Sequence, residues 1–179
     1  GVLVTGFLAM APDPVDPLKP STDANVHRGP AFGKVTDAKK ASGEDWPVYR
    51  QNNKRSGSTK MEISPELAKQ WEVKLASKGS PPVIVGDQIF TAEKDSHRVR
   101  CLSVKNGKGL WSFIAGGRID SSPTISNGMA IFGCRDGWVY CLRATDGELV
   151  WRFRAAPGDQ QIQSFGQIES VWPVQGSVL

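Results

Sequence analysis

The sequence predicts an all-β fold, and three observations favour it. Short segments rich in β-branched and aromatic residues alternate with clusters of Gly, Asn and Asp after residue 70. No hydrophobic stripe of helical period occurs in the same region. The third observation is an internal repeat, because the chain carries two copies of one pattern 40 residues apart. Together these features favour a series of short antiparallel strands.

Nine segments have the length and alternation of strands: WEVKL, PVIV, QIFTA, VRCLS, GLWSFI, PTIS, MAIFG, WVYCL and LVWRF. The connections between them include KNGK, SNG, RDG and TDG. Asn-Gly and Asp-Gly pairs favour tight hairpin turns because these residues tolerate positive φ. We therefore expect each strand to pair with the next one along the chain.

The repeat indicates the architecture. Residues 99–113 read VRCLSVKNGKGLWSF and residues 139–153 read VYCLRATDGELVWRF, so Cys, Leu, Gly, Trp and Phe recur at equivalent positions. A third tryptophan continues the spacing of 40 residues: Trp71, Trp111 and Trp151. A period of about 40 residues made of four strands is typical of a β-propeller blade, whereas helical repeats of that length need helices. We predict a partial β-propeller of about three four-stranded blades, preceded by an irregular linker.

The three tryptophans are predicted to dock each blade on its neighbour. A four-stranded sheet cannot bury both of its faces alone. An indole ring is large, flat and mostly apolar, and its N–H can bond a neighbouring carbonyl. Two glycines fit the turn before the tryptophan-bearing strand, so the predicted docking residues are Trp71, Trp111, Trp151, Gly107 and Gly147. Stacking of the tryptophans on a cofactor is the alternative interpretation.

The chain divides into three regions. Residues 1–8 resemble the end of an upstream strand, and residues 9–44 are rich in Pro without clear periodicity, which predicts an irregular linker. Residues 45–179 hold the predicted blades, an incomplete ring at about 40 residues per blade. Because the first residue is Gly and the last residues are apolar, we expect the chain to be an arc of a longer protein.

Three stretches resemble the PQQ-like β-propeller family, whose repeat takes its name from pyrroloquinoline quinone (PQQ). CLSVKNGKGLW and CLRATDGELVW resemble its tryptophan-docking motif, and DWPVYRQNNKRSG resembles the opening of propellers in large bacterial envelope proteins. The family includes quinoprotein dehydrogenases and the outer-membrane assembly lipoprotein BamB. The resemblance implies a ring of about seven or eight blades and a periplasmic or cell-envelope location. Ser103 and Arg143 stand where the usual motif has Asp, so the resemblance is stronger for fold than for activity.

The candidate ligand-binding residues lie in two connections that lead from one predicted blade to the next, 115–123 and 155–173. Propellers bind ligands on one face, and long ordered loops are often functional. The candidates are Arg118, Asp120, Gln167, Glu169, Ser170 and Trp172. For PQQ with calcium, the resemblance implies an aromatic surface, a cation and a carboxylate, which Trp172, Arg118 and Glu169 would supply. The alternative is that Arg118 and Glu169 brace the loops as ion or hydrogen-bond partners.

The sequence contains no recognisable catalytic or metal-binding motif. Its two histidines, His27 and His97, stand apart, and HExxH, GxSxG, GxGxxG and Walker A motifs do not occur. The three cysteines lack CxxC spacing, which predicts buried free thiols and not a disulfide framework. We expect no catalytic residue, no metal site and no cofactor in this segment, with PQQ and calcium as the alternative.

Charge and hydropathy narrow the class of partner. The net charge is +4 without a run of five like charges, which argues against nucleic-acid binding. The apolar run GVLVTGFLAMAP is shorter than the roughly 20 residues of a membrane span and lacks the basic start of a signal peptide.

Two functional hypotheses follow. The first is a non-catalytic scaffold that binds a protein or polysaccharide at the bacterial cell envelope, with the remaining blades of the same chain as structural partners. The second is a fragment of a PQQ- and calcium-dependent quinoprotein dehydrogenase that oxidises alcohols or sugars. The lack of catalytic motifs favours the scaffold.

Overall fold

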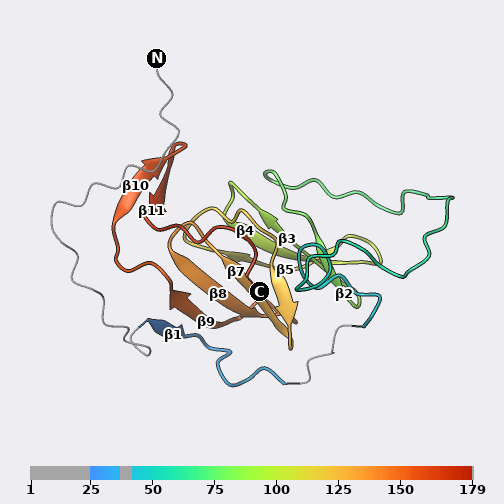
Figure 1. Cartoon of the computed structure of the whole chain (residues 1–179), viewed down its shortest axis with the longest axis horizontal. Helices are drawn as coiled ribbons and strands as arrows, with labels where there is room; N and C mark the ends of the chain where they lie inside the picture. The colour runs from blue at the N-terminus through green and yellow to red at the C-terminus, as the bar shows by residue number, and fades with distance from the viewer. Residues whose placement is uncertain (1–24, 37–41, 179) are drawn as a thin grey trace, which may run out of the picture.

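The computed structural model describes residues 25–36 and 42–178, which form strands, turns and irregular segments (Figure 1). Within these two ranges there is no α-helix. The strands form two antiparallel sheets of four and five strands and one two-stranded hairpin. The predicted all-β fold class is confirmed.

The first blade is a meander in which each strand pairs with the next: β2 (Val83–Val85), β3 (Gln88–Glu93), β4 (Arg98–Ser103) and β5 (Gly109–Ile114). The register places Phe90 opposite Cys101, and Cys101 opposite Trp111. Residues opposite one another project to the same face of a sheet. Phe90 and Cys101 are fully buried, so this face of the first blade belongs to the core.

The second blade repeats the meander: β6 (Thr124–Ser126), β7 (Met129–Gly133), β8 (Trp138–Arg143) and β9 (Leu149–Arg154). Each blade has a break in register between its third and fourth strands. It lies between Cys101 and Leu102 in the first blade and between Cys141 and Leu142 in the second. These are equivalent positions of the repeat, so the two copies agree in backbone geometry as well as in sequence.

A fifth strand, β1 (Val26–Arg28), pairs antiparallel with β9 at the outer edge of the second blade. It lies inside the region 9–44 that the sequence predicts to be an irregular linker, so part of that region is a strand. β1 has only three residues, which are too few to show the alternation of apolar and polar residues by which a strand is predicted. Residues 1–8, predicted to end an upstream strand, lie outside the described residues.

The connection 155–173, expected to be a long loop, contains a hairpin of β10 (Gln161–Ser164) and β11 (Gln167–Ser170). Its turn residues Phe165 and Gly166 have φ angles of 50° and 76°, and two positive φ angles are typical of a two-residue hairpin turn. The sequence carries no such signal, because Phe-Gly is not an Asn-Gly or Asp-Gly pair. In Figure 1 this hairpin projects away from the two sheets.

Trp111 joins the two blades. Its indole ring lies over Gly147 in the turn between β8 and β9, and Nε1 donates a hydrogen bond to the carbonyl of Ala144 at 3.0 Å. Trp71 lies over Gly107 of the first blade in the same way, although its segment WEVKL, expected to be a strand, belongs to no sheet of the described residues. The structure therefore contains two complete four-stranded blades and the docking tryptophan that precedes them.

The main core lies between the two blades. Its fully buried members include residues of both blades: Val83, Phe90, Ala92, Val99, Cys101, Ala130, Phe132 and Leu142. Phe132 and Tyr140 stack with ring centroids 5.4 Å apart, and Phe113 of the first blade packs on Tyr140. A smaller cluster on the other side of the second blade includes Trp151 and Ala31. Each blade thus buries a face against a neighbouring segment, as a repeat architecture requires.

Residues 45–48 connect the first strands of the two blades. Trp46 and Ile84 exchange two backbone hydrogen bonds of 2.7 and 2.9 Å, and the N–H of Ile125 donates to the carbonyl of Pro47 at 2.8 Å. Val48 is buried. The stretch DWPV, which the resemblance identifies as the opening of the propeller, therefore bridges β2 and β6.

Candidate functional site

Charged side chains from four connections meet at one end of the two blades. The connections are the turn 94–97, the loop 115–123, the turn 134–137 and the hairpin β10–β11. The side chains form an ion-pair cluster, the name we use for these five residues: Lys94, Arg118, Asp120, Arg135 and Glu169. Arg118 and Glu169 are only 5% and 3% exposed, and charged residues are buried to this degree almost only when they are paired.

Glu169 is the centre of the ion-pair cluster. Nε of Arg118 donates to its Oε1, Nη2 of Arg118 is in ion-pair contact with the same oxygen, and Nη1 of Arg135 donates to its Oε2 at 2.8 Å. Arg135 also donates to Oδ2 of Asp120 through Nε, and Nζ of Lys94 lies 2.6 Å from Oδ1 of Asp120. Every oxygen of the two carboxylates therefore has a cationic partner, and such charge-assisted hydrogen bonds are stronger than neutral ones.

The contacts shift the pKa values of both carboxyl groups. Burial raises the pKa of Glu169, but hydrogen bonds from Arg135 and Arg118 outweigh burial and hold this pKa below its ordinary value. Burial likewise raises the pKa of Asp120, and hydrogen bonds from Lys94 and Arg135 more than reverse the effect. Both carboxyl groups are therefore ionised at neutral pH, where they balance two of the three cations.

The ion-pair cluster and its neighbours fix the hairpin to both blades. Glu169 lies on β11, and the N–H of the adjacent Ser170 donates to the carbonyl of Arg135 in the second blade at 2.8 Å. Oε1 of Gln167, also on β11, is hydrogen-bonded to Nε2 of His97 in the first blade at 2.7 Å. The strand β11 is thus held by side-chain and backbone contacts from two directions.

Three large apolar side chains, at the turn of the hairpin and on its two strands, are exposed. Ile162, Phe165 and Ile168 are 49%, 86% and 64% exposed, and we call these three residues the apolar tip. The guanidinium of Arg118 lies 5.0 Å from the ring centroid of Phe165, within the range of a cation–π contact. The hairpin therefore combines a buried, charged residue, Glu169, with three exposed apolar side chains.

The comparisons with known proteins agree with this architecture. The protein family described as outer membrane protein assembly factor BamB matches residues 63–173, which is more than half of the chain. The chain belongs to the PQQ-like β-propeller family. No curated protein matches it significantly.

Two solved quinohemoprotein alcohol dehydrogenases share the fold at low sequence identity. Quinohemoprotein alcohol dehydrogenase from Comamonas testosteroni is 17% identical with a TM-score of 0.54, and 62% of this chain aligns with 19% of that one. Quinohemoprotein alcohol dehydrogenase ADHIIG from Pseudomonas putida HK5 is 16% identical with a TM-score of 0.58, and 64% of this chain aligns with 19% of that one. BamB from Moraxella catarrhalis is 23% identical with a TM-score of 0.43, over 51% of this chain and 31% of that one. The chain spans less than a third of each of these structures.

The PQQ-like propeller brings three of the predicted site residues together. Arg118, Asp120 and Glu169 all belong to the ion-pair cluster. Arg118 and Glu169 are direct partners, which is the arrangement expected if these residues brace the loops.

The other three predicted site residues lie nearby but apart from the cluster. Gln167 contacts His97. The hydroxyl of Ser170 accepts the backbone N–H of Trp172 at 3.1 Å, and the Trp172 side chain is 38% exposed beyond the hairpin. The six predicted residues therefore do not form one continuous ligand-binding surface.

Two members of the cluster, Lys94 and Arg135, were not predicted from the sequence. Each stands immediately before an aspartate, Asp95 or Asp136, that occupies the equivalent turn of its blade. The signal that could have identified them is this repeated cation–Asp pair between the second and third strands of each blade. A repeated charged pair in a turn is conspicuous only once the repeat has been aligned.

The cluster does not fit a calcium-bound quinone. Calcium needs several carboxylate or carbonyl oxygens, and all four oxygens of Asp120 and Glu169 already have cationic partners. In residues 25–36 and 42–178, no three His, Cys, Asp or Glu side chains gather into a group that could hold a metal ion. The same part of the chain contains no helix of the length and apolarity that a membrane crossing requires.

Proposed function

We propose that the chain is a non-catalytic PQQ-like propeller module that binds a protein partner at the bacterial cell envelope. The matched family is described as an outer membrane protein assembly factor, which supports an envelope location, most simply the periplasm, and an assembly role. The remaining blades of the ring would come from the rest of the same protein.

The observation that carries the proposal is how the hairpin β10–β11 is attached to the two blades. Its apolar tip exposes three large side chains, while β11 is fixed by the contacts of Glu169 and Ser170. Exposed apolar groups on a soluble surface favour protein–protein contact. A pre-ordered hairpin also loses little conformational freedom on binding, which favours affinity. These properties suit a protein partner better than a polysaccharide, which is bound mainly through polar groups.

The ion-pair cluster supports binding over catalysis. Its carboxylates are ionised and fully engaged by arginine and lysine. A general acid or base needs a pKa near the working pH and a free path to a substrate. The pKa shifts of Asp120 and Glu169 go in the opposite direction.

The alternative function is part of a quinoprotein dehydrogenase that oxidises alcohols or sugars with PQQ and calcium. It is supported by the shared fold with two quinohemoprotein alcohol dehydrogenases. In that case the cofactor ligands would come from blades outside this chain.

The test places a photo-crosslinking amino acid at Ile168 of the full-length protein in its native host. The matched control carries the same group at Leu67, which is 81% exposed but lies outside the hairpin. We expect one defined envelope protein to be linked through position 168 and not through position 67. Equal labelling at both positions would contradict the proposal. So would a quinone absorbance band with dye-linked alcohol or sugar oxidation after reconstitution with PQQ and calcium.

A further inference from the structure

The two blades differ at their outer edges. Along β9 the N–H of Arg154 donates to the carbonyl of Asn25, and the N–H of Gly29 donates to the carbonyl of Val150, both at 2.8 Å. β5, the equivalent strand of the first blade, is the last strand of its sheet in the described part of the chain. An unpaired edge presents a row of N–H and C=O groups that can bond another strand.

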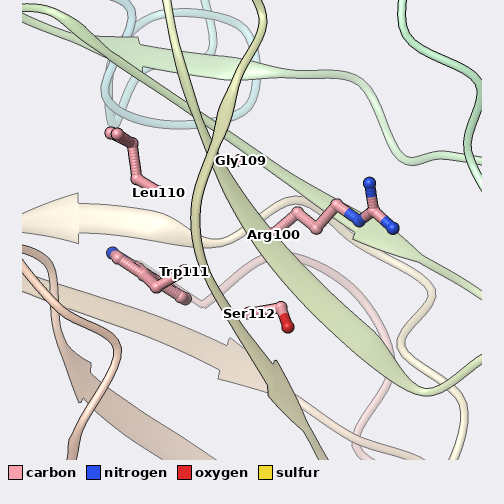
Figure 2. A pocket seen from close by; sticks show the side chains of 5 residues that line it. All are labelled: Arg100, Gly109, Leu110, Trp111 and Ser112. Carbon is pink, nitrogen blue, oxygen red and sulfur yellow. The ribbon is translucent and has the colours of Figure 1, made fainter.

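The open edge of β5 carries a pocket, shown in Figure 2. Its volume is about 230 Å³, and it is lined by Arg100 and four consecutive residues of β5: Gly109, Leu110, Trp111 and Ser112. In Figure 2 the side chains of Arg100 and Ser112 lie on one side of β5, and that of Trp111 lies on the other. Leu110 is 50% exposed. The pocket thus lies along β5 and offers both polar and apolar surface.

The second blade shows how a strand pairs with such an edge. β1 places His27 opposite Arg152, and Ser112 is the residue of β5 equivalent to Arg152 in the repeat. A strand in the same register on β5 would place its middle residue opposite Ser112. Its side chain would project to the face that also carries Arg100, because Arg100 is opposite Ser112 on β4.

The charges on that face favour an acidic side chain at this position. Arg98 and Arg100 both project to it from β4, in the same alternation. The fully buried carboxylate of Glu93 lies 2.8 Å from Nε of Arg100. Nε of Arg98 is buried without a hydrogen-bond partner among the residues described. One carboxylate therefore faces two guanidinium groups, which leaves an excess positive charge beside the pocket.

We propose that the outer edge of β5 binds an extended segment of a partner protein. The segment adds to the first blade as an antiparallel fifth strand, as β1 does on the second blade, with an acidic residue opposite Ser112. A second copy of β1 is a poorer occupant, because the residue that it would place opposite Ser112 is His27, which brings no negative charge to Arg98 and Arg100. This surface is separate from the apolar tip, so the inference does not depend on the proposed function.

The test measures binding of two fluorescein-labelled peptides to the full-length protein by fluorescence anisotropy. Both peptides alternate Val and Thr, which favour extended strands, and they differ only at the central residue, Asp in one and Lys in the other. The peptide with Asp is expected to bind about tenfold more tightly than the peptide with Lys. Arg98 and Arg100 attract the central Asp and repel the central Lys.

Variants of β5 locate the binding site. Ser112 is exposed, so Ser112→Asp and Ser112→Lys should fold normally. We expect Ser112→Asp to weaken binding of the acidic peptide about threefold and Ser112→Lys to strengthen it about threefold. Ile114→Pro removes the N–H equivalent to that of Arg154, which bonds β1, and should abolish binding of both peptides. Proline is tolerated at a strand edge. If Ile114→Pro does not fold, the two Ser112 variants still test whether the peptide binds at β5.

Two results would overturn the proposal. One is equal affinity for the two peptides with no response to either Ser112 variant. The other is self-association of the protein that Ile114→Pro prevents, which would make a second copy the occupant. Ile168→Ser in the apolar tip should leave peptide binding unchanged, so this proposal and the proposed function can fail separately.

Discussion

The indole ring of Trp111 lies over Gly147, and its Nε1 bonds the carbonyl of Ala144 in the same turn. Trp71 and Gly107 repeat this relationship one blade earlier. In both contacts the hydrogen-bond donor and acceptor are 33 residues apart, so the contact is itself part of the repeat. The glycine is needed for two reasons, because its φ is positive and because the ring leaves no room for a Cβ atom.

Gly147→Ala is expected to destabilise the fold by about 3 kcal/mol, from strained φ and overlap with the ring. Gly147 has a φ of 77°, and an added Cβ would come within 2.5 Å of Trp111. Gly166 is the matched control, because its φ is 76° and nothing lies within 4 Å. Gly166→Ala should therefore cost only about 1 kcal/mol. Guanidinium unfolding measures both, and equal losses would show that the ring contact contributes nothing.

Trp111→Phe tests the hydrogen bond of the docking contact. Phenylalanine keeps most of the apolar surface but leaves the carbonyl of Ala144 with only the longer bond from Nε2 of Gln88 at 3.4 Å. We therefore expect a loss of about 1 kcal/mol in the free energy of unfolding. Trp172→Phe is the control, since Trp172 is 38% exposed, and its change should stay within about 0.5 kcal/mol. A loss no larger than that control would argue against the docking role.

Glu169→Gln removes the charge at the centre of the ion-pair cluster. The buried guanidinium of Arg118 would keep only the exposed carboxylate of Asp95, 4.0 Å away, as a counter-charge, which should destabilise the fold by about 3 kcal/mol. The amides of β10 and β11 should exchange with solvent faster, as measured by hydrogen–deuterium exchange. Asp146→Asn is the control, because its ion pair with Arg143 is exposed and should contribute at most about 1 kcal/mol. Unchanged exchange in the hairpin would show that the cluster does not hold it.

The depressed pKa values of Asp120 and Glu169 make stability depend on pH. Their ordinary values are 3.8 and 4.5, and the unfolded chain takes up protons before the folded one. The stabilisation is therefore complete above about pH 4.5 and is lost as the pH falls through the lower folded-state values. A variant with Asp120→Asn and Glu169→Gln should lose less stability than the wild type between about pH 5 and pH 3. Parallel pH profiles would contradict this expectation.

The three cysteines should be unreactive in the folded protein. Cys101, Cys134 and Cys141 are free and buried, as the sequence predicts, and burial raises the pKa of Cys101 and Cys141 to about 12 and also raises that of Cys134. Thiolate is the reactive species. Ellman's reagent should therefore modify none of the three in native buffer and all three in denaturant. Rapid modification of one thiol without denaturant would show a local opening of its blade.

The parts of the fold that the sequence predicted are those set by local repetition. Strand alternation, Gly-containing turns and the tryptophan spacing all recur in both blades, so two copies reinforce each other. The segments QIFTA, MAIFG, VRCLS and WVYCL form strands for two reasons. Apolar residues alternate within them, and the turns that connect them accept positive φ.

The remaining features depend on contacts between distant segments. β1 is stabilised by pairing with β9, which lies more than 120 residues later, and its own three residues carry no pattern. WEVKL has strand alternation but lacks a neighbouring strand in the described residues. Arg118 and Glu169 could be identified as candidates from their loops, but Lys94 and Arg135 entered the site only through the packing of the two blades.

The hairpin β10–β11 lies in a connection that follows β9, whereas the contacts that dock the blades run between an outer strand and the next turn. Insertions in that connection therefore leave the angle between blades unchanged. Related proteins could lengthen, shorten or replace the hairpin and acquire new binding specificity without any compensating change in the ring.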